Sequence, residues 1–176
     1  QILKYLAIII LYFMGWKRKG EKINIKKSII FSYPHTTNWD GIITILMMKI
    51  YNDTCVIKGE SLIYRIIANI IGAIHINRNK KSSKTDLIAD IINKKNKCNL
   101  YISPEGTRKK NNKIKSGFYY IAKKTNVPII CGALDYRTKE YSWSKPIYVK
   151  DLSYEETVKK IRDYYVNNDL YNSAKY

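Results

Sequence analysis

The 176 residues of this chain give room for one ordinary domain with a hydrophobic core of its own. Hydrophobic residues make up 45% and charged residues 26% of the sequence, which excludes a disordered or fibrous chain. The net charge of +18 favours anionic partners such as phosphates, nucleic acids or acidic lipid surfaces. Most of the cations are lysines in a sequence also rich in Ile, Asn and Tyr, all with A/T-rich codons. Part of the charge therefore reflects composition, and charge alone assigns no partner.

The chain opens on an apolar stretch whose uninterrupted part, residues 6–14, is shorter than the ~20 residues of a membrane-spanning helix. Lys17, Arg18 and Lys19 follow it. Three interpretations are open: part of a truncated span, a helix in the membrane interface, and a core helix. Aromatic residues followed by cations are typical of interface anchors, so the interfacial helix is favoured. We expect an apolar N-terminal segment over residues 1–16 and a folded domain over residues 17–176.

Strands and helices are expected to alternate from residue 28 onwards, because short apolar runs are separated by segments with apolar residues at helical spacing. The expected strands cover residues 28–33, 54–58, 73–77, 99–103 and 128–134. The expected helices cover residues 39–51, 60–71, 82–95, 116–125 and 154–167. Strands that are apolar throughout indicate a sheet covered on both faces. The predicted fold class is α/β: a single domain with a mixed, mostly parallel sheet flanked by helices.

Metal-ligating and disulfide-forming residues are few. Cys55, Cys98 and Cys131 lie far apart and form no CxxC pair, which argues against a zinc site or a disulfide framework and fits a reducing compartment. With only His35 and His75, a multi-histidine centre cannot be assembled. We therefore expect no metal.

His35 follows the first expected strand and stands five residues before Asp40. In a continuous helix this spacing separates two side chains by ~140°, so a turn must bring them together. Pro34 disfavours helical geometry before it, and Asn38 is a suitable N-cap, which places His35 on a loop and Asp40 in a helix's first turn. There Asp40 could orient a general base, acting on a substrate hydroxyl because no GxSxG turn is present. The other interpretation of His35 is an ordinary loop residue.

A second group of functional residue types stands at residues 103–108, Ser-Pro-Glu-Gly-Thr-Arg. Glu105 offers a carboxylate, Gly106 frees backbone amides and Arg108 offers a guanidinium, so this turn can bind a phosphate or an oxyanion. Arg78 directly follows another expected strand, and both arginines could reach one anionic group beyond the sheet. For the neighbouring lysines a solvated loop is the simpler interpretation.

Four blocks stand in order along the chain: HTTNWD at residues 35–40, GAIHINR at 72–78, PEGTR at 104–108 and VPI at 127–129. They resemble the H-x4-D, G-x-I-x-I-x-R, P-E-G-T-R and V-P-I motifs of the glycerolipid acyltransferase family, whose members acylate glycerol-3-phosphate or lysophosphatidate. The resemblance covers about residues 16–147 and is strongest to a short bacterial-type branch. Asn77 departs from the pattern, since many members have Asp there.

The resemblance implies a role for each matched residue. His35 takes the proton from the acceptor hydroxyl as that hydroxyl attacks an acyl thioester, and Asp40 orients the imidazole. The residues implied to bind the substrate are Lys58, Arg78, Glu105, Gly106, Thr107 and Arg108. The resemblance further implies no bound cofactor, with acyl-CoA or acyl carrier protein as co-substrate.

We therefore expect an O-acyltransferase of phospholipid biosynthesis, associated with the cytoplasmic face of an anionic membrane and acting on a glycerophosphate-type acceptor such as lysophosphatidate. One alternative is a basic nucleic-acid-binding module, but the sequence has no RNP, zinc-finger or helix-turn-helix signature, so no nucleic acid partner is expected. Another is a relative that only binds lipid or acts on another lysolipid. The intact His35 and Asp40 argue against a silent relative.

Overall fold

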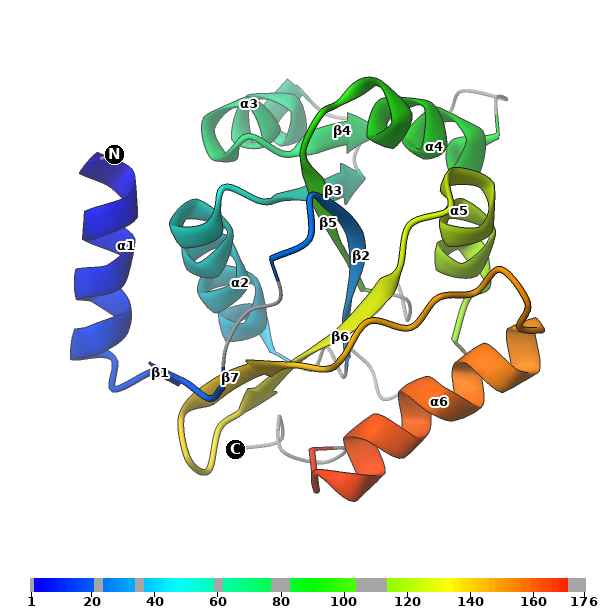
Figure 1. The fold of residues 1–176 in the computed structure, drawn as a ribbon. Helices are drawn as coiled ribbons and strands as arrows, with labels where there is room; N and C mark the ends of the chain where they lie inside the picture. Colours follow the sequence, from blue (N-terminus) through cyan, green and yellow to red (C-terminus); the bar gives the residue numbers. More distant parts are fainter. Residues whose placement is uncertain are drawn as a thin grey trace.

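A seven-stranded sheet forms the middle of the molecule in the computed structural model, which describes residues 2–20, 24–33, 37–58, 62–76, 83–103 and 114–170 (Figure 1). The strands are β1 (Lys17–Arg18), β2 (Lys27–Ser32), β3 (Thr54–Lys58), β4 (Ile74–Ile76), β5 (Cys98–Ile102), β6 (Ile129–Asp135) and β7 (Glu140–Trp143). Their order across the sheet is β1-β7-β6-β2-β5-β3-β4. The strands from β6 to β4 are parallel, whereas β7 runs antiparallel to β6 and β1 pairs parallel with β7. The mixed, mostly parallel α/β fold is confirmed.

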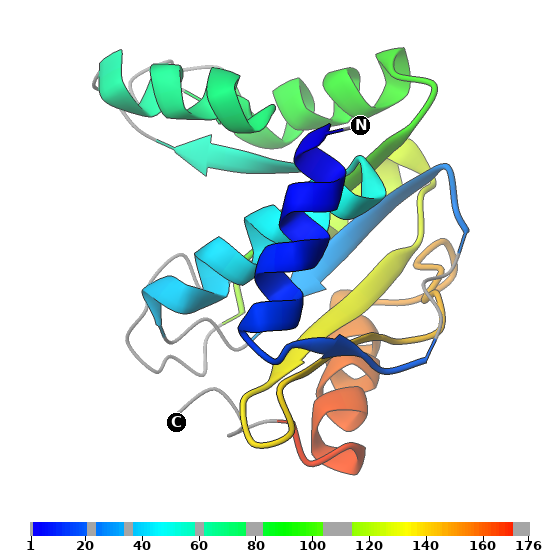
Figure 2. The same ribbon diagram turned by 90° about the vertical axis from the view of Figure 1, so that its left-hand side faces the viewer.

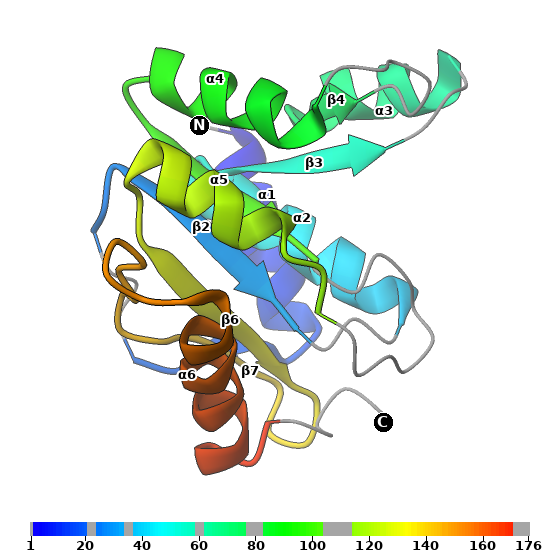
Figure 3. The same ribbon diagram turned by 90° about the vertical axis from the view of Figure 1, so that its right-hand side faces the viewer.

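Helices cover both faces of this sheet. They are α1 (Ile2–Phe13), α2 (Asn38–Tyr51), α3 (Leu62–Ile71), α4 (Lys84–Lys94), α5 (Gly117–Thr125) and α6 (Tyr154–Asn167). α1 and α2 lie on one face, and α4, α5 and α6 on the other (Figures 1 and 3). Because both faces are covered, the central strands carry buried apolar residues on both sides, such as the run Ile29–Phe31 in β2.

Successive side chains of β2 point to opposite faces of the sheet. Ile29 and Phe31 face α5 and α6, and the ring of Phe31 packs edge-on against Phe118 with centroids 4.8 Å apart. Ile30 points to the opposite face, where it packs with Met48 of α2. All of these side chains are almost completely buried. Because β2 is buried on both faces, its position in the middle of the sheet is fixed, and so is the position of its carboxyl end.

α6 is joined to the sheet by a buried hydroxyl. Tyr165 is fully buried, and its phenol donates to the carbonyl oxygens of Phe31 and Gly132 at 2.9 and 2.8 Å. Phe31 lies on β2 and Gly132 on the neighbouring strand β6, where Gly132 is the register partner of Ser32, the residue after Phe31. The phenol therefore bridges the two strands close to their carboxyl ends.

Each expected strand and helix from residue 28 onwards is present, with its ends within two residues of the predicted ones. The sequence interpretation missed β1 and β7. β7 is the short segment Glu-Tyr-Ser-Trp, which is only partly buried and has no continuous apolar run. It forms by returning antiparallel along β6, with Asp135 opposite Glu140 and Gly132 opposite Trp143. β1 then pairs with β7, which brings the N-terminal segment to this edge of the sheet.

Candidate active site

The carboxyl ends of the parallel strands meet at one edge of the sheet, and the predicted site residues follow these ends. β2 ends at Ser32, between β5 and β6. Lys58 ends β3 and is opposite Ile76, the last residue of β4. In open parallel sheets, ligands bind beyond such carboxyl ends. The strands that precede the predicted residues in the chain therefore end at a common edge of the sheet.

Of the predicted site residues, the structure describes Asp40 and the backbone of Lys58. The others lie outside the described residues: His35, Arg78, Glu105, Gly106, Thr107 and Arg108. Along the chain, His35 follows the end of β2 by three positions, Arg78 follows β4 by two, and Glu105 follows β5 by three. Each group therefore comes directly after a different strand of the parallel sheet.

Asp40 is a buried carboxylate in the first turn of α2, with 3% of its surface exposed. Its Oδ2 accepts the backbone N–H of Thr37 at 2.9 Å, and the Thr37 hydroxyl in turn caps the helix and accepts the N–H of Trp39 at 3.0 Å. A carboxylate at a helix N-terminus is also stabilised by the helix dipole. The prediction that Asn38 is the N-cap is wrong. Thr37 takes that place because it forms a capping box with Asp40, and Asn38 becomes the first helical residue.

A second donor reaches Asp40 from a distant part of the chain. Tyr136 directly follows β6, and its phenol donates a hydrogen bond to Oδ1 of Asp40. Burial raises the pKa of Tyr136 well above its ordinary value, and the hydrogen bond and charge of Asp40 raise it further. The phenol is therefore a neutral donor throughout the physiological range. Sequence reasoning missed Tyr136, although its place directly after a strand, at the carboxyl edge, was an available signal.

The two oxygens of Asp40 are thus held by different donors, one from the helix end and one from the turn after β6. Two donors on opposite oxygens restrict rotation of the carboxylate about its last bond. A buried, negatively charged group of fixed orientation can direct a neighbouring imidazole and stabilise it when it takes up a proton.

α1 exposes most of its apolar side chains. Leu11 is buried and packs with Ile43 and Met47 of α2. The exposed apolar residues of the helix have 41% to 83% of their surface accessible: Ile2, Leu3, Tyr5, Leu6, Ile8, Ile9, Ile10, Tyr12 and Phe13. Figure 2 shows α1 as the outermost layer on its side of the molecule. Within the described part of the chain, every helix falls short of the length and apolarity that a membrane crossing requires.

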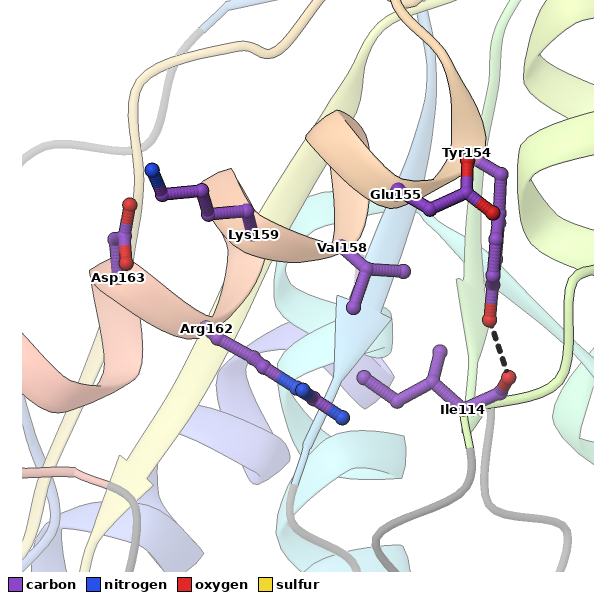
Figure 4. A pocket seen from close by; sticks show the side chains of 7 residues that line it. All are labelled: Ile114, Tyr154, Glu155, Val158, Lys159, Arg162 and Asp163. Carbon is purple, nitrogen blue, oxygen red and sulfur yellow. Dashed lines mark hydrogen bonds between the residues drawn. The ribbon is translucent and has the colours of Figure 1, made fainter.

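A surface pocket of about 560 Å³ lies along α6 (Figure 4). It is lined by Ile114, Tyr154, Glu155, Val158, Lys159, Arg162 and Asp163. The phenol of Tyr154 donates to the carbonyl oxygen of Ile114 at one end. The lining combines two carboxylates with two cations, so it has no net charge that would select an anion. Neither Asp40 nor Tyr136 contributes to it, and we assign it no part in the site.

A model of the acyltransferase family matches residues 17–134. The chain belongs to the acyltransferase family. The recognition from four short motifs is confirmed, and the chain is an acyltransferase enzyme. The range that matches this family contains all of the predicted site residues, from His35 to Arg108, and ends two residues before Tyr136. It also leaves out α1.

The fold of this acyltransferase is similar to that of the 1-acyl-sn-glycerophosphate (LPA) acyltransferase PlsC from Thermotoga maritima, with a TM-score of 0.67. The similarity covers 99% of this chain and 79% of that chain, at 13% sequence identity. A similarity at this identity concerns the fold, and it supports the predicted fold class. A comparison with curated protein sequences gives no significant match.

Proposed function

We propose that this acyltransferase moves a fatty acyl group from acyl-CoA or acyl carrier protein to the hydroxyl of a glycerophosphate-type lipid such as lysophosphatidate, without a metal or a bound cofactor. The observation that carries the proposal is Asp40, a buried carboxylate held by two donors in the helix that follows His35. The acceptor class is supported by the Thermotoga maritima protein of similar fold, whose name gives 1-acyl-sn-glycerophosphate as its substrate.

In the proposed reaction His35 is the general base. Its unprotonated nitrogen takes the proton of the acceptor hydroxyl while the oxygen attacks the thioester carbonyl carbon. The Asp40 carboxylate orients the ring and stabilises the imidazolium. The C–S bond then breaks, an ester forms, and the imidazolium returns its proton to the departing thiolate. The balance is one hydroxyl and one thioester consumed for one ester and one thiol.

The phosphate of the acceptor is assigned to the cations that follow the parallel strands. Arg78 and Arg108 offer planar forks that match phosphate oxygens, and Lys58 adds a point charge at the end of β3. Glu105 and Thr107 are assigned to positioning the acceptor. Backbone amides near Gly106 are assigned to the oxyanion that forms at the thioester carbonyl.

The phosphate assignment is tested with matched acceptors. Arg108→Ala is expected to weaken the use of lysophosphatidate far more than that of monoacylglycerol, because the two acceptors differ only in the phosphate. Arg162→Ala is the matched control, since it removes a guanidinium on α6 and should affect both acceptors equally. Equal losses with both acceptors in Arg108→Ala contradict the assignment.

We also propose that the exposed apolar surface of α1 lies in the interface of an anionic membrane, on the cytoplasmic side. Tyr12 and Phe13 are 76% and 83% exposed, and the side chains of Lys17 and Lys19, in and after β1, are exposed as well. An apolar helix face followed by cations suits the boundary between acyl chains and acidic headgroups. The described cysteines are free thiols, which fits a reducing compartment.

Membrane binding is measured by sedimentation with vesicles of phosphatidylcholine, with and without phosphatidylglycerol. Binding is expected to increase with the anionic lipid and to fall in Tyr12→Asp/Phe13→Asp. Tyr148→Asp is the control, because Tyr148 is also an exposed aromatic residue, with 61% of its surface accessible, but lies outside α1. Binding of the α1 variant at the wild-type level contradicts the proposal.

A further inference from the structure

We propose that Tyr136 is a positioning residue of the acyl transfer, whose phenol holds the Asp40 carboxylate in the orientation that directs His35. The inference rests on the proposed function, which gives His35 and Asp40 their roles. It adds a residue from outside the range that matches the acyltransferase family.

The first support is that the two oxygens of the Asp40 carboxylate accept hydrogen bonds from donors on different elements. The amide of Thr37 holds Oδ2 and belongs to the same helix end as Asp40, so it moves with the helix. Tyr136 holds Oδ1 and comes from the turn between β6 and β7, 96 residues away in the chain. Of these two donors, the second ties the orientation of Asp40 to the sheet. The plane of the carboxylate is therefore set by two independent elements.

The second support is that the phenol ring of Tyr136 packs against an aromatic ring and an apolar cluster. Trp16, which follows α1 and is 7% exposed, meets Tyr136 edge to face at 5.1 Å between centroids and 90° between planes. Both rings belong to an apolar cluster with Leu11 of α1, Ile43 of α2 and Tyr141 of β7. A ring held in this way gives its hydroxyl little freedom to leave Asp40.

The third support is that the charged side chains of the same turn are engaged elsewhere. Oδ1 of Asp135 accepts the backbone N–H of Arg137 at 3.0 Å, and the guanidinium of Arg137 donates to the carbonyl oxygen of Asp169 at 2.8 Å. Nζ of Lys139 donates to the carbonyl oxygen of Met14 at 3.1 Å. These bonds fix the turn on both sides of Tyr136. They leave a neutral phenol, not a cation, as the group that the turn presents to Asp40.

A neutral donor suits a carboxylate that must remain charged. A cation on Oδ1 would compensate the charge that stabilises the imidazolium, whereas a phenol orients the carboxylate and leaves its charge in place. The phenol nevertheless provides one of the hydrogen bonds that stabilise the charged carboxylate of Asp40. Without it, Asp40 should attract the proton on His35 more strongly, so the pKa of His35 should increase, while the carboxylate loses its fixed plane.

The test is Tyr136→Phe, which keeps the ring against Trp16 and removes the hydroxyl. We expect kcat to fall about ten- to a hundredfold, the range of one hydrogen bond to a charged group, with the KM of both substrates unchanged. The acidic limb of the rate–pH profile should move to higher pH, an effect that a loss of packing alone would not produce. Tyr148→Phe removes an exposed hydroxyl outside the cluster and should leave rate and profile unchanged.

A second readout does not require turnover. The chain has two histidines, so the imidazole signals can be titrated by NMR and assigned with His75→Gln. We expect the pKa of His35 to fall in Asp40→Asn and to increase in Tyr136→Phe. If Asp40→Asn lowers it but Tyr136→Phe changes neither pKa nor kcat, the role of Tyr136 is refuted and the proposed function stands. If Asp40→Asn changes neither, the catalytic pair itself is wrong, and the role of Tyr136 is refuted with it.

Discussion

Asp40→Asn separates the catalytic role of this residue from its structural one. The substitution preserves the shape of the side chain and removes its charge. The amide oxygen can still accept the N–H of Thr37, and the amide nitrogen can donate to the phenol oxygen of Tyr136, because a phenol both donates and accepts. Both partners therefore stay hydrogen-bonded, and the protein should remain folded.

The magnitudes follow from this geometry. Two charge-assisted hydrogen bonds become neutral ones, and the helix N-terminus loses a negative charge, so the free energy of unfolding should fall by about 1–3 kcal/mol. Loss of the carboxylate that orients the general base should lower kcat by a factor of about 10²–10⁴. This corresponds to an increase of about 3–5 kcal/mol in the activation free energy. The loss of activity therefore exceeds what unfolding explains.

The assay pairs kcat at 25 °C with urea unfolding of the same samples. Glu156→Gln is the matched control, because Glu156 and Ser153 form the same type of capping box at the start of α6. That variant should lose some stability and keep its activity. The reasoning is refuted if Asp40→Asn keeps wild-type kcat, or if its activity falls only in proportion to the fraction of folded protein.

Three further outcomes are expected. The rate should fall as the pH drops through the pKa of His35, at ~6.5 or above, because protonation removes the base; a flat profile between pH 5 and 8 contradicts this. Tyr165→Phe should lower the free energy of unfolding by about 1–3 kcal/mol, because the carbonyl oxygens of Phe31 and Gly132 lose the phenol as a donor. An unchanged urea midpoint would contradict a stabilising role of these two hydrogen bonds. Burial raises the pKa of Cys55 to about 11 and that of Cys131 to about 12, so both thiols should react with a disulfide reagent at pH 8 much more slowly in the folded chain than in urea; equal rates refute this.

The central sheet could be predicted because burial on both faces leaves a direct mark on the sequence. Strands β2 and β6 each contain a run of consecutive buried apolar residues, and the helices between the strands have their own periodicity. β7 leaves no such mark. It is short and partly buried, and it exists because the chain reverses after Asp135 and pairs with β6. The pairing depends on a neighbour rather than on a pattern within the segment.

The same distinction applies to the site. Asp40 could be predicted because the H-x4-D block spans only six consecutive residues and can be recognised from its histidine and aspartate alone. Thr37 as the cap was also available, since a hydroxyl followed three residues later by an acid is a capping-box pattern. The contact of Tyr136 with Asp40 joins positions 96 residues apart and depends on the unpredicted hairpin. Long-range contacts of this kind follow from the assembled fold.

The most direct test of the proposed reaction compares the wild-type chain with His35→Ala, using acyl-CoA and lysophosphatidate. Free thiol is measured together with the mass of the lipid product. The wild-type chain should release one thiol for each acyl ester formed, only with both substrates present, and His35→Ala should lose both products. Equal turnover by His35→Ala, or thiol release by the wild-type chain that does not depend on the acceptor, would contradict a base-catalysed acyl transfer to the lipid hydroxyl.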